Sequence, residues 1–199
     1  MKKSLAAFCV VLALNALCAA KPQAQPQAGA SAVPVTVDNF VRAESDGYFA
    51  NLARQAGGVG RLMHRREPAS MDHQRVTRHN RATLYSSGVF DLDAGAVTVT
   101  MPDAGKRFMS MQVVSEDHYV PNVFYGAGTH SLTRENVGTR YVLVGIRTLV
   151  DPDSADDVRQ VHALQDSIKV DQASAGKLDL PAWDPVSQKK VRDALIALN

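Results

Sequence analysis

The chain has little cysteine: Cys9 and Cys18 are its only two, and both lie within the first twenty of its 199 residues. A domain built from the remaining residues cannot use disulfides and must be stabilised by its hydrophobic core. Trp183 is the only tryptophan, so no series of aromatic side chains indicates base stacking with a nucleic acid. The sequence also lacks a P-loop, a dinucleotide fingerprint, a His-Glu-x-x-His motif and a Gly-x-Ser-x-Gly motif. These absences exclude the easily recognised enzyme classes but leave an unusual enzyme open.

The N-terminal segment has the features of a secretory signal. A pair of lysines precedes an apolar run over residues 5–17, and two alanines, Ala19 and Ala20, follow it. The run is shorter than the ~20 residues that a bilayer-spanning helix needs. We therefore expect a signal peptide over residues 1–20 and a periplasmic or secreted protein without a membrane span. A buried N-terminal helix would leave the lysine pair unexplained.

Cys18 offers an alternative in which the exported chain carries a lipid anchor. A lipobox requires a small residue before the cysteine, and Leu17 is not small, so this alternative is less favoured. Loss of residues 1–20 would remove two of the 22 basic residues and leave them equal in number to the 20 acidic ones. With a formal net charge of zero, bulk charge does not predict binding to nucleic acid or to an anionic membrane.

Residues 21–35 consist mainly of proline, glutamine, alanine and serine without a hydrophobic period, which predicts a flexible linker. The remaining residues, 36–199, are then one globular domain. Helical spacing of apolar residues predicts a helix over residues 38–55. Alternation of apolar and polar residues predicts strands between residues 84 and 150.

Two of these strands, residues 97–101 and 109–113, flank a turn at residues 102–105 and are expected to form a hairpin. Residues 141–150 are apolar on both faces, which is typical of a central strand. Two helices should follow, and the last begins at Asp184-Pro185 and would bury Val191 and Leu195. This order indicates an α+β fold: one antiparallel sheet of about 5–7 strands covered by an N-terminal helix and two C-terminal helices.

The histidines do not predict a metal site, and no cofactor is expected. Zinc sites usually contain a pair of ligands three to five residues apart, and no two histidines have this spacing. A metal site would form only if the fold gathered distant residues. The six histidines are His64, His73, His79, His118, His130 and His162.

Two polar clusters hold the candidate site residues. In the first, after the strand at residues 109–113, Asp117 could orient His118 as a general base, and Glu116 and Tyr119 could contact a ligand. Side chains of neighbouring strand residues diverge, however, so a hydrogen-bonded turn is the alternative. The second cluster lies at the start of the first strand, and its candidate ligand-binding residues are Asn80, Arg81, Thr83 and Tyr85. Farther along that strand, Asp91 and Asp93 could hold calcium or, more simply, form a turn.

Six ordered motifs together resemble the bacterial domain-of-unknown-function family 1254 (DUF1254). They are Asn-Arg-x-Thr-Leu-Tyr-Ser at 80–86, VFDLDAG at 89–95, MPDAGKRFMSMQVVSEDHY at 101–119, YGAG at 125–128, GTRYVLVGIRTLVDP at 138–152 and VHALQDSIKV at 161–170. The resemblance implies an exported protein of unknown activity. Relatives often carry a second domain of the 1214 type, so it also implies a stand-alone member lacking that domain. Relatives usually have aspartate where this chain has Ala82, which puts any chemical role of that acid in doubt here.

Two hypotheses for function remain. The first is a ligand-binding or accessory module outside the cytoplasm, whose partner is a small molecule or another protein. The second is a hydrolase-like or metal-assisted enzyme, in which Asp117 orients His118 and Arg81 holds an anionic group beside Asn80 and Tyr85. The missing nucleophile motif and the absent acid favour the first. Homo-oligomerisation through an exposed strand edge stays open.

Overall fold

The computed structural model describes residues 32–70 and 80–198, which belong to one compact unit. The expected signal peptide, most of the expected linker, His73 and His79 lie outside the described residues. Within the described part of the chain, no helix is both long and apolar enough to cross a membrane.

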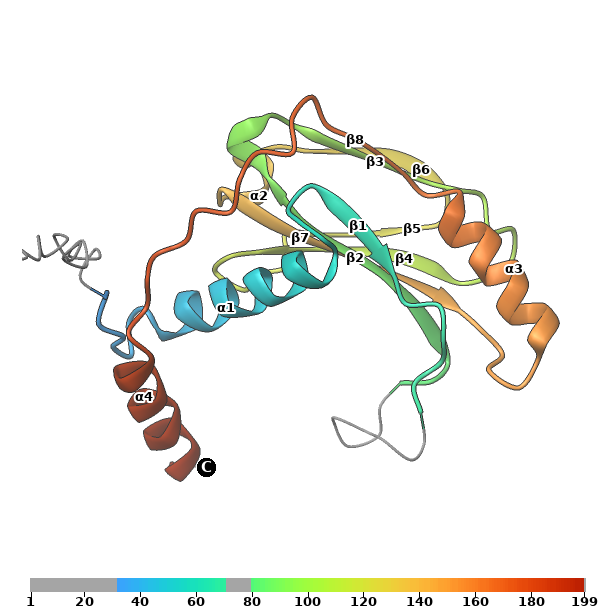
Figure 1. Cartoon of the computed structure of the whole chain (residues 1–199). Coiled ribbons are helices and arrows are strands. Elements are labelled where there is room, and N and C mark those ends of the chain that lie inside the picture. Colours follow the sequence, from blue (N-terminus) through green and yellow to red (C-terminus); the bar gives the residue numbers. More distant parts are fainter. Residues whose placement is uncertain (1–31, 71–79, 199) are drawn as a thin grey trace, which may run out of the picture. The chain divides into compact units, whose positions relative to one another are not determined.

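The strands form two antiparallel sheets (Figure 1). The α+β class predicted from the sequence is confirmed, and the larger sheet has five strands. Its order is β1 (Arg61–His64), β2 (Thr83–Asp91), β7 (Tyr141–Leu149), β4 (Met109–Ser115) and β5 (Asn122–Tyr125). The second sheet has the order β6 (Gly128–Leu132), β3 (Val97–Met101) and β8 (Lys169–Asp171). As its apolar pattern predicted, β7 is the central strand of the larger sheet.

The main hydrophobic core lies between the two sheets. Every second residue of β3 and β4 points into it, so Val99 and Met111 are fully buried, as are Val144 and Ile146 of β7. The sequence predicted which residues of β3 and β4 are buried but paired these strands as a hairpin, which is wrong. The two strands belong to different sheets, and the turn after Met101 carries the chain from one layer to the other.

The helices lie around the five-stranded sheet rather than on its core face. The α1 helix (Phe40–Gln55) packs on the outer face, where Phe49 and Leu52 contact Val89 and Leu143. The α3 helix (Ala155–Asp166) buries Val161 near the ends of β2 and β7. Shorter elements are η1 (Leu92–Ala94) and α2 (Arg134–Val137).

The last helix differs from the sequence-based prediction in how much of it is buried. In α4 (Pro185–Ala197), Asp184 caps the first turn as predicted, but no residue of the helix is buried. It lies against α1, where Arg192 pairs with Glu44 (Figure 1). The second sheet, rather than a pair of C-terminal helices, covers the core face of the larger sheet, because it buries the alternating apolar residues of both sheets at once.

Two carboxylates at the end of β2 form ion pairs with arginines that are distant in the sequence. Asp91 is buried and accepts two hydrogen bonds from Arg140, at 3.0 and 2.9 Å, and one from the backbone N–H of Asp93 at 3.1 Å. The Arg140 hydrogen bonds lower the pKa of Asp91 below its usual value. Asp93 pairs with Arg134. Both carboxylates are thus paired with arginine side chains. Asp91 and Asp93 form the turn that the sequence suggested as the alternative to a calcium site.

Candidate functional site

A pocket of about 430 Å³ opens on the outer face of the five-stranded sheet. The α1 helix covers this face around Leu143, which is buried. Farther along β7, at Gly145 and Arg147, the sheet surface becomes the floor of the pocket. The pocket therefore lies over β7, the central strand of the five-stranded sheet.

The floor follows the register of three neighbouring strands. Gly145 of β7 lies between Ser87 of β2 and Gln112 of β4, and Arg147 lies beside Tyr85 of β2. Because side chains alternate between the two faces of a strand, all five positions face away from the sandwich core. A Cβ atom built on Gly145 would meet only Cδ2 of Leu143, at 3.8 Å. Among the described residues, packing around Gly145 would therefore allow a larger side chain, and the glycine leaves an open space in the pocket floor.

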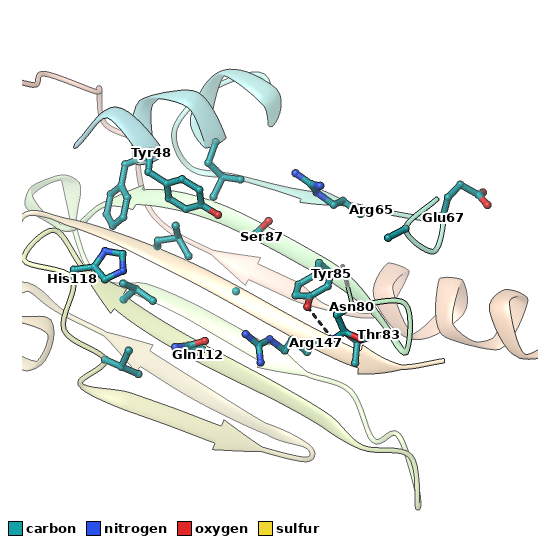
Figure 2. A pocket seen from close by; sticks show the side chains of 17 residues that line it. Tyr48, Arg65, Glu67, Asn80, Thr83, Tyr85, Ser87, Gln112, His118 and Arg147 are labelled. Carbon is teal, nitrogen blue, oxygen red and sulfur yellow. Dashed lines mark hydrogen bonds between the residues drawn. The ribbon is translucent and has the colours of Figure 1, made fainter. Parts of the chain in front are cut away.

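One end of the pocket is largely apolar (Figure 2). Its side chains come from α1, from the sheet and from the segment after β4, and they are Tyr48, Phe49, Leu52, Val114, Val120 and Leu143. His118 lies at this end together with Tyr48. Tyr48 of α1 is 58% exposed and lines the pocket.

The other end is polar and contains three of the predicted residues. The side-chain amide of Asn80 donates hydrogen bonds to Oη of Tyr85, at 3.1 Å, and to Oγ1 of Thr83, at 2.9 Å. The side-chain oxygen of Asn80, Oδ1, accepts a hydrogen bond from the backbone N–H of Ala82 at 2.9 Å. This bond fixes the orientation of the Asn80 side-chain amide. Because the oxygen of Tyr85 already accepts a hydrogen bond, its own O–H hydrogen is free to be donated elsewhere.

Arg147 brings a positive charge to this polar end. Its guanidinium carbon lies 5.7 Å from the centroid of the Tyr85 ring. Within the described residues, its guanidinium has no hydrogen bond or ion pair with any side chain. Arg65 and Glu67 stand on the rim, where Arg65 donates a hydrogen bond to Gln55 at 3.4 Å.

The predicted pairing of Asp117 with His118 is not present. Asp117 accepts a hydrogen bond from Nε of Arg42 at 3.0 Å, on α1, and it does not line the pocket. The His118 imidazole instead lies 3.2 Å from Oγ of Ser45. The alternative interpretation, a hydrogen-bonded turn, is confirmed: the N–H of His118 donates to the carbonyl of Ser115 at 3.0 Å, and His118 adopts a left-handed φ of 64°.

Three further candidates lie outside the pocket. Glu116 is buried, and its carboxylate accepts a hydrogen bond from the N–H of Tyr141 at 2.9 Å, which joins β4 to β7. Arg81 donates to the carbonyl oxygen of Ala69 at 3.0 Å. Tyr119 is 76% exposed. Of the eight residues proposed from the sequence, the structure therefore brings four into the pocket: Asn80, Thr83, Tyr85 and His118.

Pattern reasoning missed the residues of the pocket floor. Gly145 and Arg147 lie in a segment whose apolar residues on both faces indicate a buried central strand. A glycine and an arginine on the same face of such a strand interrupt that pattern, and this interruption is the signal that could have identified them. Ser87 and Gln112 carry no comparable signal, because polar residues at alternate positions are ordinary in a strand.

A buried acid lies on α1 behind the His118 end. Asp46 is 1% exposed, and its Oδ2 accepts a hydrogen bond from the indole N–H of Trp183 at 2.9 Å. Its Oδ1 has no hydrogen-bond partner among the residues described. Burial is the main cause that raises the pKa of Asp46 to about 6, and the neighbouring Glu116 raises it further. The acid tethers the segment before α4 to α1.

No three histidine, cysteine, aspartate or glutamate side chains within residues 32–70 and 80–198 are close enough together to hold a metal ion. The described histidines have separate partners. His64 lies 2.7 Å from Oγ of Ser86, His162 lies 2.7 Å from the carbonyl of Arg66, and His130 stacks on Phe124.

Comparison with known proteins supports the family resemblance. Residues 59–145 match the model of a family described as "Protein of unknown function (DUF1254)". This range contains the first four motifs and part of the fifth. A search of curated proteins found no match. Among solved structures, the VPA0106 protein from Vibrio parahaemolyticus is similar, with a TM-score of 0.56 and 16% sequence identity. The match covers 74% of this chain but 41% of that one, and at this identity it shows the fold alone.

Proposed function

We propose that this protein, whose residues 59–145 form a DUF1254 region, is a module that binds a small molecule in the pocket over β7. The observation that carries the proposal is the open space above Gly145. Glycine in the interior of a strand is destabilising by roughly 0.5–1 kcal/mol relative to alanine, and it often marks a place where a ligand approaches the backbone. Apart from the chain neighbours of Gly145, the only described side chain within 4 Å of a Cβ built there is Leu143, at 3.8 Å.

The size and the lining of the pocket agree with this proposal. Its volume of about 430 Å³ lies within the range typical of small-molecule sites, roughly 300–1,000 Å³. Such sites combine an apolar lining with a few polar groups that orient the ligand. Here Ser87, Gln112 and Arg147 line the floor, and none of their side chains has a hydrogen-bond partner in the described part of the protein.

The enzyme hypothesis has no comparable support. It required Asp117 to orient His118 and Arg81 to hold an anionic group close to them. Asp117 is held by Arg42, and Arg81 is bound to the backbone of Ala69 outside the pocket. A base at His118 would therefore act without the predicted partners.

Replacing Gly145 by valine should abolish binding without unfolding the protein. Valine suits a strand, and the nearest atom to its Cβ would be 3.8 Å away, so the free energy of unfolding should stay constant or rise by up to about 1 kcal/mol. The measurement is a thermal-shift screen of small acids, alcohols, amines and sugars against both proteins. A ligand at ~100 times its Kd should stabilise the wild type by ~2.7 kcal/mol and leave Gly145→Val unaffected.

Gly47→Ala is the matched control, because Gly47 is an exposed position of α1 with nothing within 4 Å of an added Cβ and does not line the pocket. It should bind as the wild type does. Gly145→Ala serves as a milder variant, with a partial loss of affinity. A compound that stabilises the wild type and Gly145→Val equally would show that the pocket is not the binding site.

We also propose that the protein acts after export, in the periplasm or outside the cell. The proposal is supported by the lysine pair, the short apolar run and the two alanines at the start of the sequence. When the full chain is expressed in a bacterium with a periplasm, the intact mass of the mature protein should lack residues 1–20. Recovery from the cytosol with Met1 retained would contradict export, and a mass corresponding to a lipid on Cys18 would support the anchored alternative.

A further inference from the structure

We infer that the ligand is an amphipathic organic anion, whose carboxylate or phosphate head lies against Arg147 and whose apolar body lies beneath α1. This inference rests on the proposed function and deepens it by naming the chemical class of the ligand. It follows from how charge, hydrogen-bond donors and apolar surface are distributed within one pocket.

Among the residues that the structure describes, no carboxylate forms an ion pair with Arg147. Two partly buried arginines elsewhere in the described chain pair with carboxylates, Arg107 with Asp157 and Arg140 with Asp91, whereas Arg147 is exposed. Arg147 has instead only the face of the Tyr85 ring at 5.7 Å, and its neighbours across the sheet, Tyr85 and Ser110, carry no charge. Its planar fork of N–H donors fits a carboxylate or a phosphate through two parallel hydrogen bonds.

The hydrogen-bonding groups beside Arg147 are also suited to an anion. Tyr85 can donate its O–H because Asn80 already donates to its oxygen at 3.1 Å. Among the described residues that line the pocket, Glu67 is the only one with a carboxylate, and it stands on the rim near Arg65. Figure 2 shows its side chain directed outward, away from Arg147. The polar end therefore offers a cation and a hydrogen-bond donor, and no described carboxylate points toward the place of an anionic head.

The apolar end provides the complementary half. Phe49, Leu52 and Leu143 are buried there. Figure 2 shows Tyr48 and His118 at one end of the pocket and Asn80 and Thr83 at the other. A ligand with its head at Arg147 would pass over Gly145, which has no side chain of its own, and place its apolar part beneath α1. Burying apolar surface is favourable by roughly 25 cal/mol per Å², so both ends contribute to binding.

The test compares four probes with the same alkyl chain: decanoate, decyl phosphate, decanol and decylammonium. Calorimetric titration below the micelle-forming concentration should show decanoate or decyl phosphate binding the wild type at least ~10-fold more tightly than decanol, and decylammonium binding most weakly. Arg147→Met should weaken binding of the anions ~10- to 100-fold and leave decanol unchanged, because only the anions lose a charged hydrogen bond. The tighter of the two anions identifies the head group.

Arg159→Met is the control, since Arg159 is an exposed residue of α3 far from the pocket lining, and its binding should equal that of the wild type. Melting temperatures should confirm that all variants fold. If decanol binds as tightly as decanoate and neither responds to Arg147→Met, the anion inference is overturned while the pocket remains a binding site. The anion inference is also overturned, and the pocket remains a binding site, if only compounds other than organic anions bind and Gly145→Val abolishes their binding. If no compound tried binds, both proposals fail.

Discussion

Replacing Met111 by alanine should lower the free energy of unfolding by about 2–5 kcal/mol. Met111 is fully buried in the middle of β4, where its cross-strand neighbours are Ile146 of β7 and Phe124 of β5. Its side chain points into the core between the two sheets, so truncation leaves a cavity bounded by both layers. Rigid strands on each side limit how far the core can collapse into that cavity. Urea denaturation at neutral pH measures the loss.

Gln112→Ala provides the matched control one residue along the same strand. Gln112 is half-buried and faces the pocket, where its side chain has no hydrogen-bond partner among the described residues. Its truncation should change the free energy of unfolding by less than about 1 kcal/mol. Equal losses for Met111→Ala and Gln112→Ala would contradict the assignment of the two faces of β4.

The Met111 result concerns a feature that the sequence does predict well. The alternation at Val97–Met101 and Met109–Val113 identifies the buried residues, because a strand with one buried face must place an apolar side chain at every second position. The same alternation does not identify the partner of the strand. A short turn between two strands is compatible with a hairpin or with a change of layer. Here Val99 and Met111 belong to different sheets and are buried in the core between them.

Short and exposed elements were the least predictable. The β1 strand (Arg61–His64) lies at the edge of its sheet and has no fully buried residue, so no apolar alternation marks it. The last helix has enough apolar residues to suggest a buried face, but Leu195 is 41% exposed. Amphipathic spacing indicates which face of a helix would be buried, and it does not show that a partner is present.

The candidate site was half predictable for a related reason. Chemical clustering along the sequence found Asn80, Thr83 and Tyr85, because these residues lie at the start of one strand and share hydrogen bonds. It could not find Arg147, which is distant in sequence and joins them only through the pairing of β2 with β7. The direction of the Asp117 side chain depended on Arg42, in a helix 75 residues earlier. Local patterns contain neither of these long-range contacts.

Asp46→Asn is expected to stabilise the protein at pH 8, by about 1–3 kcal/mol. The carboxyl group of Asp46 is buried beside Glu116, and burial raises its pKa from 3.8 to about 6. One pKa unit corresponds to about 1.4 kcal/mol, so the difference between these values sets an upper bound of about 3 kcal/mol. Asparagine removes the buried charge, and its side-chain oxygen can still accept the hydrogen bond from the indole of Trp183.

The sign of the pH dependence follows from the raised pKa of Asp46. Below about pH 4 the carboxyl group is protonated in both the folded and the unfolded chain, so the variant should gain little there. Between about pH 4 and 6 the unfolded chain ionises first, and the wild type loses stability that the variant keeps. The difference between the two free energies of unfolding should therefore grow over this interval and stay constant above it, as measured by urea denaturation at a series of pH values.

Asp117→Asn is the control for Asp46→Asn. It also removes one negative charge near Arg42, so it shows whether the loss of any such charge gives the same pH-dependent gain in stability. Arg42, whose charge also acts on Asp46, forms an ion pair with Asp117. The Asp117 side chain is 48% exposed, and an exposed ion pair contributes at most about 1 kcal/mol. Its replacement should therefore give no gain that grows between pH 4 and 6. If Asp46→Asn instead destabilised the protein at pH 8, the ionised carboxylate would have to be held by Trp183 and Arg42 more strongly than burial disfavours it. The pKa of Asp46 would then lie below its usual value in the folded protein, and the contact between α1 and the segment carrying Trp183 would depend on a charge rather than on a neutral acid.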